Sequence, residues 1–265
     1  MSTSAPLQVF IRGIGVLGSG LPDWATARAL LASPQDWAPL PVELPPPARL
    51  PAAERRRSGG IVKLSLAVAE QAIAMAGADP SGLATVFSSS SGDGANCDAL
   101  CAALAQPERA LSPTRFTNSV HNTSAGYWHI ACASRAPSTS LCAYDTHFGA
   151  ALLEAAAQCL AWQRPLLLVS VDVPYPEPLL SKRPLAGSFG VALLLAPGPG
   201  GRALQLAVGQ GDADGCGHAG LETLRGGIPA ARCLPLLEAL AGAGPASTAI
   251  GLADGLVLQL QLAAP

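Results

Sequence analysis

The sequence predicts an α/β protein in which helices cover a largely buried sheet. Short apolar runs recur along the chain, and segments with helical spacing separate them. Hydrophobic residues make up 49% of the 265 residues, and charged residues make up only 13%. This charged share is about half of the usual ~25%, and a chain of this length can bury a sizeable core.

The first part of the chain predicts a strand, a helix, a connector and a long helix. Residues 9–14 are a β-branched run that ends at glycine. Residues 22–32 have helical spacing, and their proline and aspartate suit a first turn. Residues 39–51 are too rich in proline for regular structure, so we expect an extended surface segment. Residues 52–76 have the apolar pattern of a long helix interrupted by a pair of glycines.

From residue 83 onward, apolar strands alternate with helical segments. The predicted strands are residues 83–87, 138–143, 165–171, 190–195, 204–208 and 255–262. The predicted helices are residues 96–105, 122–133, 146–161 and 234–241. This alternation is typical of an α/β protein with a largely buried sheet.

The composition argues against two classes of partner. The formal net charge is −2, which provides no electrostatic basis for binding nucleic acid or an anionic membrane. No stretch approaches the ~20 apolar residues that a membrane-spanning helix needs. We therefore expect neither a nucleic-acid partner nor a membrane span. Because few charges are present to cover an apolar protein, we expect an oligomer.

The cysteines and the start of the chain predict a cytoplasmic location. Met1 to Pro6 lacks a basic segment followed by an apolar run, so it does not resemble a signal peptide. The seven cysteines are an odd number, spread from Cys97 to Cys233. Reduced thiols in the cytoplasm fit this pattern better than disulfides.

Residues 13–18 satisfy the glycine spacing of a dinucleotide-binding loop, G-x-G-x-x-G, directly after a strand. The following helix starts only at Pro22, and the proline-rich connector stands where an acidic ribose ligand is needed. We interpret the glycines as a tight turn needed for packing, and we expect no cofactor.

Three other patterns have simple interpretations. Residues 88–94 suit a small-residue turn at a strand end, although such a turn could form an anion nest. Cys216 and His218 lack a second pair at metal spacing, so we expect no metal site. Residues 54–57, Glu-Arg-Arg-Arg, suit a solvated helix start, with a basic patch for an acidic carrier protein as the weaker alternative.

The informative region is residues 112–152. Here the strand 138–143 meets the helix 146–161 through an abrupt turn. This is the geometry of a nucleophile elbow, in which a reactive side chain sits at a helix N-terminus. The macrodipole and free amides there stabilise a thiolate or an oxyanion. The sequence therefore predicts the candidate site at this turn.

This region resembles the active-site region of the β-ketoacyl synthases, which have thiolase-type folds. That family carries N-x-x-A-G, then G-P-S, a strand, and T-A-C-S-S-S at the start of a helix. Asn122, Ala125 and Gly126 match the first segment, and Pro137 with Ser138 matches the second.

Two counts locate the family's nucleophilic cysteine in this chain. One count runs forward from Pro137, and the other runs back from the alanine and leucine at 151–152. Both place the nucleophile at Asp145. The resemblance thus implies that the nucleophile has been replaced by a carboxylate.

Other segments extend the resemblance. Residues 9–18 are similar to the family's opening strand and glycine turn, and residues 189–195 resemble the strand that closes its first half. Residues 252–258 loosely resemble its terminal strand. The resemblance covers residues 7–197 well, while residues 198–265 are far too short for a full second half. It implies one thiolase-like domain over 1–265, a layered α/β sandwich with mixed sheets and a truncated second half.

The departures from the family bear on activity. The family's catalytic histidines lie in H-G-T-G-T and G-H-x-x-G segments, which are missing here; residues 217–220 are only faintly similar to the second. Because Claisen condensation needs a thiolate and supporting imidazoles, we expect no catalytic residue in this chain. We expect the Asp145 carboxylate to cap the following helix.

Two neighbours of Asp145 are weaker candidates. Cys142 lies inside the predicted strand, three residues before the elbow, and is expected to be a small buried thiol. His147 is expected near the Asp145 carboxylate, although a catalytic pair needs a third group.

The resemblance implies a role beside an active partner. A nucleophile-less homologue that pairs with an active ketosynthase is called a chain-length factor. The chain resembles short ketoacyl-synthase-like proteins of bacterial aryl-polyene and xanthomonadin-type pigment pathways, whose phrase S-P-T-x-F-x-N-S-V-H-N is echoed in residues 112–122. In thiolase-type dimers the strand before the elbow pairs across the two-fold axis. Residues 116–122 and 138–148 are therefore expected to face the partner.

The expected role is steric. The chain would form a heterodimer with a ketosynthase subunit and shape the tunnel for an acyl chain carried by an acyl carrier protein. The candidate tunnel or interface residues are Phe116, Asn118, His121, Asn122, Tyr144 and Phe148. Two alternatives remain open: a stand-alone acyltransferase or thioesterase that uses Asp145, His147 or Cys142, and a homodimeric carrier-protein scaffold.

Overall fold

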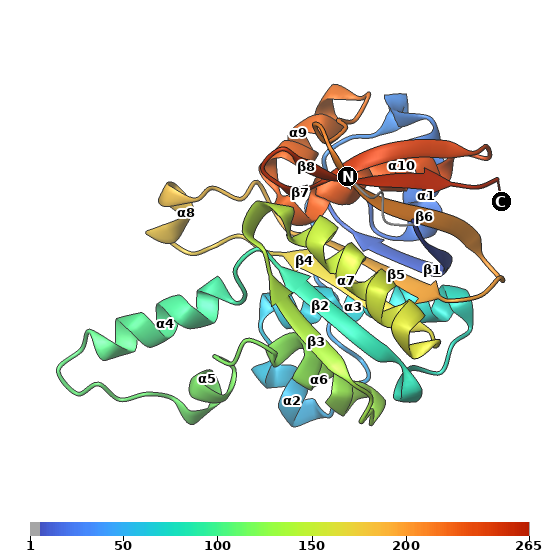
Figure 1. Cartoon of the computed structure of the whole chain (residues 1–265). Helices are drawn as coiled ribbons and strands as arrows, with labels where there is room; N and C mark the ends of the chain where they lie inside the picture. Colours follow the sequence, from blue (N-terminus) through green and yellow to red (C-terminus); the bar gives the residue numbers. More distant parts are fainter. Residues whose placement is uncertain (1–5, 265) are drawn as a thin grey trace.

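The fold is built on an eight-stranded mixed sheet, described over residues 6–264 in a computed structural model (Figure 1). Residues 1–5, which make up most of the Met1–Pro6 segment at the start of the chain, lie outside the described residues. The strands are β1 (Leu7–Leu17), β2 (Ala84–Ser89), β3 (Ser138–Cys142), β4 (Leu166–Asp172), β5 (Phe189–Ala196), β6 (Arg202–Gln210), β7 (Ala246–Ala253) and β8 (Leu256–Leu262). Their spatial order is β3-β2-β4-β5-β1-β6-β8-β7.

Strand direction divides the sheet into two parts. β2 runs parallel to both of its neighbours, β3 and β4. All other pairings of named strands among the described residues are antiparallel. Residues 202–262 extend this same sheet, because β6 pairs with β1 and is followed outward by β8 and β7. The α/β class predicted from the sequence is confirmed.

Helices cover both faces of the sheet. The α-helices are α1 (Trp24–Ala32), α2 (Ala52–Arg57), α3 (Gly60–Ala76), α4 (Gly94–Leu104), α5 (Pro113–Thr117), α6 (Thr123–Cys132), α7 (His147–Trp162), α8 (Leu179–Lys182), α9 (Ala219–Gly227) and α10 (Leu234–Ala241). Short 3₁₀ helices are η1 (Pro34–Asp36), η2 (Pro80–Gly82), η3 (Tyr144–Thr146) and η4 (Pro229–Cys233). None of the helices in residues 6–264 combines the length and apolar sequence needed to span a membrane.

Two hydrophobic cores lie on opposite faces of the sheet. One joins the sheet to α1, α7, α9, η4 and α10, and the other joins it to α3 and α6. Strand β4 shows the alternation: Leu166 and Leu168 enter the first core, whereas Leu167 and Val169 enter the second. Burial on both faces explains why its sequence is a continuous apolar run.

The structure corrects several predicted elements. The helix expected over residues 52–76 is two helices, because the chain leaves helical geometry at Ser58 and Gly59 between α2 and α3. Strand β7 and helices α5, α8 and α9 were not predicted. Strand β7 has three alanines and one glycine among its eight residues, which gives it a weak strand propensity, and it forms by pairing with β8. The connector over residues 39–51 has no helix or strand, as predicted.

Helices α4 and α5 extend away from the layered body, as Figure 1 shows. We call residues 94–117 the α4–α5 arm. Of the residues in α4, only Asn96 is buried, and the arm exposes the large apolar side chains of Leu104, Leu111 and Phe116. Exposed apolar groups gathered on a projecting element are typical of a surface that meets a partner.

The glycines at 13 and 15 lie within β1 and not in the tight turn predicted for them. A Cβ atom on Gly13 would lie 2.1 Å from the carbonyl oxygen of Ala72, and one on Gly15 would lie 2.0 Å from that of Val68. Both oxygens belong to α3. The glycines therefore let this helix approach the sheet closely, so the expected packing role is correct and the turn is not.

We predict that Gly15→Ala destabilises the fold by about 2–3 kcal/mol, because the new methyl group forces α3 away from β1. Chemical denaturation followed by circular dichroism measures this change. The matched control is Gly226→Ala in α9, where an added Cβ meets nothing within 4 Å. The control should change stability by no more than about 1 kcal/mol, in the stabilising direction.

Candidate functional site

The candidate site lies at the edge of the sheet where the three parallel strands end. β2, β3 and β4 run in the same direction, so their carboxyl ends meet at one edge. The last residues of these strands are Ser89, Cys142 and Asp172. In open α/β sheets, this edge is where ligand sites commonly form.

Asp172 is buried at this edge and accepts three hydrogen bonds. Its carboxylate accepts from the backbone N–H of Ser90 at 2.9 Å and of Ala230 at 2.8 Å. It also accepts from His147 Nε2 at 2.9 Å. Burial alone would raise the pKa of Asp172, but the hydrogen bonds and charge of His147 and the bond from Ser90 bring it below its usual value.

His147 is also fully buried, and it completes the arrangement. Because Nε2 donates to the carboxylate, Nδ1 faces two hydroxyl groups, Ser88 Oγ at 3.1 Å and Ser170 Oγ at 3.2 Å. We call Asp172, His147, Ser88, Ser90, Ser170 and Ala230 the Asp172 network. The predicted proximity of His147 to the Asp145 carboxylate is wrong as a contact, since its partner is Asp172.

The network has the order of a serine–histidine–aspartate triad, and Ser88 is also among the residues that line the pocket described below. Alternate residues of a strand point to opposite faces. On β2, Val86 belongs to the core on the α7 side and Phe87 to the core on the α3 side, so the Ser88 side chain points toward α7. All six residues of the Asp172 network are buried.

Asp145 lies in η3 between β3 and α7, at the elbow predicted from the sequence. Its two carboxylate oxygens accept from two guanidinium groups, Arg183 Nη2 and Arg232 Nη2, each at 2.9 Å. The expected helix cap is wrong: α7 has no side-chain cap, and Thr146 occupies the cap position. The ion pairs take the carboxylate that a cap would have used.

The backbone of the elbow is strained at the residue before Asp145. Tyr144 has a φ of 50°, in the left-handed region that residues other than glycine rarely adopt. Its exposed ring lies under the Arg183 guanidinium, 3.5 Å from the ring centroid. A strained strand-to-helix turn is the geometry of a nucleophile elbow. Neither Tyr144 nor Asp145 carries a thiol or an aliphatic hydroxyl group.

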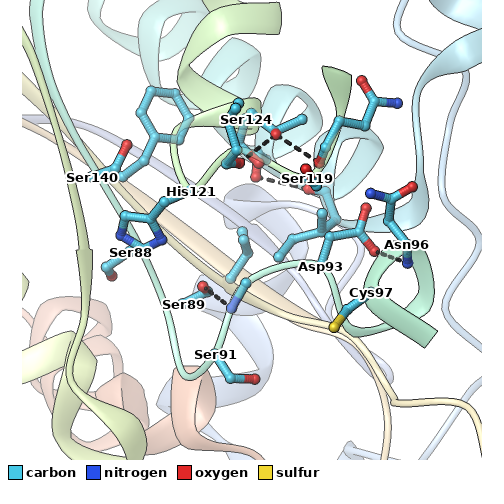
Figure 2. Close-up of a pocket in the computed structure, with 18 of the residues that line it drawn as sticks. Ser88, Ser89, Ser91, Asp93, Asn96, Cys97, Ser119, His121, Ser124 and Ser140 are labelled. Carbon is cyan, nitrogen blue, oxygen red and sulfur yellow. Dashed lines mark hydrogen bonds between the residues drawn. The ribbon is translucent and has the colours of Figure 1, made fainter. Parts of the chain in front are cut away.

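A pocket of about 280 Å³ opens beside this edge, between β2, β3, α4 and the segment before α6 (Figure 2). Its apolar lining includes Ile61, Phe87, Leu100, Val120, Leu141 and Val171. Figure 2 shows His121, Ser89 and Ser140 on one side of the pocket and Asn96 and Cys97 on the other. Asn118 and His121 are the two predicted tunnel residues that line it.

The other predicted tunnel or interface residues lie apart from the pocket. Phe116 is 66% exposed on α5, and Tyr144 is exposed at the elbow. Asn122 is exposed at the start of α6 and makes no side-chain cap. Phe148 is 1% exposed and packs in the core on the α7 side, so the expectation that it faces a partner is wrong. As a buried residue of α7, it serves the chain's own packing.

Cys142 is exposed, which contradicts the prediction of a small buried thiol. β3 is an edge strand with a partly exposed sequence, whereas a central strand would bury this position. The Cys142 sulfur lies 3.5 Å from Ser89 Oγ and 3.8 Å from His121 Nδ1.

Several important residues were missed in the sequence. Asp172 had a signal, because a charged residue closes the strongly apolar strand β4. Arg183 and Arg232 had none, since they lie 38 and 87 residues from Asp145. Residues 6–264 contain no group of three or more histidine, cysteine or acidic side chains placed to hold a metal ion.

The sequence profile of the family described as "Beta-ketoacyl synthase, N-terminal domain" matches residues 24–223. The chain belongs to this family. No curated protein matches the chain.

Solved structures agree on the fold. A chain of the ketosynthase (ApeO) in complex with its chain length factor (ApeC) from Xenorhabdus doucetiae is 21% identical, with a TM-score of 0.74. The match covers 96% of this chain and 99% of that one. The ishigamide ketosynthase/chain length factor has 15% identity and a TM-score of 0.69, with 98% and 99% covered.

A third structure is the AntDE:AntF complex, a type II PKS acyl-carrier protein with its ketosynthase bound to the hexaketide. It has 11% identity and a TM-score of 0.77, with 98% and 100% of the two chains covered. At these identities the similarity shows the fold, and the predicted thiolase-like class is confirmed.

We predict that Asp172→Asn destabilises the fold by about 3 kcal/mol at neutral pH, because it removes a buried charge to which three donors point. The lowered pKa of Asp172 means that its contribution is fully present above the unfolded-state pKa. The contribution is lost as the pH falls through the folded-state pKa. The difference between the two proteins should therefore shrink below about pH 4.

Urea denaturation over a pH series measures this difference. Asp212→Asn, at an exposed position, is the control and should leave stability unchanged at each pH. A difference that stays constant down to the lowest pH would show that the Asp172 charge does not carry the effect.

Proposed function

We propose that the chain is a non-catalytic, chain-length-factor-like subunit that pairs with an active β-ketoacyl synthase. The observation that carries this proposal is the state of the elbow. Asp145, at the position of the family's cysteine, is held by two arginines from distant segments. A carboxylate in two ion pairs is a poor nucleophile, because attack would require it to give up both partners.

The surroundings of Asp145 also argue against condensation. The imidazole nearest in sequence, His147, is buried and engaged by Asp172. The histidine-bearing segments of the family's second half are absent from the sequence. The alternative of an acyltransferase that uses Asp145 with His147 therefore loses its geometric basis.

Two features support a partner on the side of β3. The outer edge of β3 is unpaired within the described residues, since β3 ends the sheet order. Unpaired strand edges are templates for pairing with another chain. Exposed apolar side chains lie on the arm and near this edge, among them Phe116, Val120 and Tyr144. The solved structures with this fold include complexes between a ketosynthase and its chain length factor.

The pocket at the carboxyl ends of β2 and β3 supports a steric role. Apolar side chains such as Phe87 and Leu141 form part of its lining, and Val120 and His121 line it from a segment that would meet the partner. In a heterodimer this lining would close one side of the partner's acyl tunnel. The size of its side chains would then limit the length of the chain that is built, in aryl-polyene or related pigment synthesis.

A second cavity supports binding of an acyl carrier protein. It has a volume of about 330 Å³, and its lining includes Arg56, Arg57 and Arg115. Three arginines against one aspartate, Asp93, in the lining favour an acidic or phosphorylated partner. The carrier protein would present the growing acyl chain to the heterodimer. We place this reaction in the cytoplasm, because the seven unpaired cysteines of the described residues fit a reducing environment.

We predict that Phe116→Asp weakens binding to the ketosynthase partner by about tenfold or more, because it places a charge in an apolar interface. The side chain is 66% exposed, so the variant should fold normally. Leu40→Asp is the matched control, since Leu40 is 62% exposed on the connector. Biolayer interferometry with a candidate β-ketoacyl synthase partner compares the two variants.

Two experimental results would contradict the proposal. One is equal binding of wild type and Phe116→Asp. The other is a chain that forms only homodimers by light scattering and leaves the product length of the ketosynthase unchanged, which would favour a carrier-protein scaffold.

We also predict that Asp145→Cys does not restore condensation. A thiol at this position would lie between Arg183 and Arg232 without the imidazoles that decarboxylation needs. The assay supplies acyl and malonyl carrier protein to the purified variant and detects the ketoacyl product by mass spectrometry. Product formed by the variant alone would show that only the cysteine had been lost.

A further inference from the structure

Cys142 stands out from the other cysteines by its surroundings. It is exposed at the carboxyl end of β3, and its sulfur contacts an imidazole and a hydroxyl group. Among the described residues it is the one cysteine hydrogen-bonded to a histidine. The two contacts come from different segments, the end of β2 and the loop before α6, so the sheet edge assembles this group.

Five of the other six thiols are held in their protonated form. Burial raises the pKa of Cys132 and of Cys159 to about 11, and the pKa of Cys216 to about 12. Burial also raises the pKa of Cys233 and, more weakly, that of Cys97. Because the thiolate is the nucleophile, these cysteines are poorly suited to react.

The partners of Cys142 open onto the pocket. His121 and Ser89 both line it, and so do Ser140 and Leu141, the two residues before Cys142 on β3 (Figure 2). The lining also includes apolar side chains, among them Phe87, Leu100 and Val171. The volume of about 280 Å³ lies near the lower end of typical ligand sites, which suits a short acyl chain.

We propose that Cys142 accepts an acyl group from a thioester, with His121 as its base. The Cys142 sulfur attacks the thioester carbonyl and forms a new thioester bond, while the bond to the donor's sulfur breaks. His121 takes the proton from the Cys142 thiol and returns it to the departing thiolate, so no further reactant is needed. The acyl chain then lies in the pocket.

This activity goes beyond the steric role and uses a different residue from the vacated nucleophile position. It would let a subunit that cannot condense still hold an acyl chain beside its partner. The proposal does not depend on the heterodimer, because the thiol, the imidazole and the pocket all belong to this chain.

The experiment incubates the purified full chain with the octanoyl thioester of N-acetylcysteamine and measures acylation by intact mass and peptide mapping. We expect one hydroxylamine-labile octanoyl group on Cys142. Cys142→Ser should abolish labelling. The control variant Cys101→Ser, at an exposed thiol that does not line the pocket, should be labelled as the wild type is.

His121→Asn tests the base. At neutral pH it should slow labelling by about tenfold or more, because the thiol loses its proton acceptor. Near pH 9 the difference should narrow, because hydroxide can then remove the proton that His121 takes at neutral pH. A merely structural role of His121 would not produce this pH dependence.

Labelling that is absent, or that falls equally on Cys97 or Cys101, would overturn the proposal, as would a His121→Asn variant that reacts like wild type at neutral pH. Neither result would affect the proposed chain-length role. The Phe116→Asp variant separates the two roles: it should bind the ketosynthase more weakly but be labelled on Cys142 as the wild type is.

Discussion

The buried carboxylate of Asp172 is the constraint on which the arrangement of this protein depends. A buried charge is tolerated only where hydrogen bonds replace the lost water. Its donors come from the turn after β2, from α7 and from η4, while Asp172 itself ends β4. Four segments far apart in the sequence must therefore meet at one point. Any movement of one segment would leave a buried donor or the carboxylate unpaired.

The Asp172 network also determines where the elbow lies. Asp145 is two residues before His147, and Arg232 is two residues after Ala230, so the network brings both ends of this ion pair to the same edge. The close approach of α3 to β1 acts on the other face, where glycines at 13 and 15 leave no room for a side chain. Together these contacts fix helices against both faces of the sheet. At the carboxyl ends of the parallel strands, Cys142 is exposed.

The elbow places the carboxylate of Asp145 on a strained turn between a strand and a long helix. The strand, the strained turn and the long helix are all present, but the carboxylate at the turn is neutralised by two guanidinium groups. Those groups come from the loop after β4 and from η4, which lie beyond the matched nucleophile region. The two ion pairs therefore stabilise the turn and occupy both oxygens of the Asp145 carboxylate. The exposed thiol of Cys142 lies on the same edge but makes separate contacts.

The sequence by itself determined the α/β class and most of the strands and helices, because these follow from local apolar spacing, and it placed Asp145 at the turn between a strand and a helix. It also placed Asn118 and His121 in the segment that lines the pocket. Only the tertiary structure decided the partners: His147 binds Asp172, Asp145 binds two arginines, Phe148 is buried and Cys142 is exposed. Each depends on which strand lies at the sheet edge and which distant segment folds against it. The local sequence pattern does not reveal the order of the strands in the sheet, because burial and ion pairing depend on contacts between residues far apart in the chain.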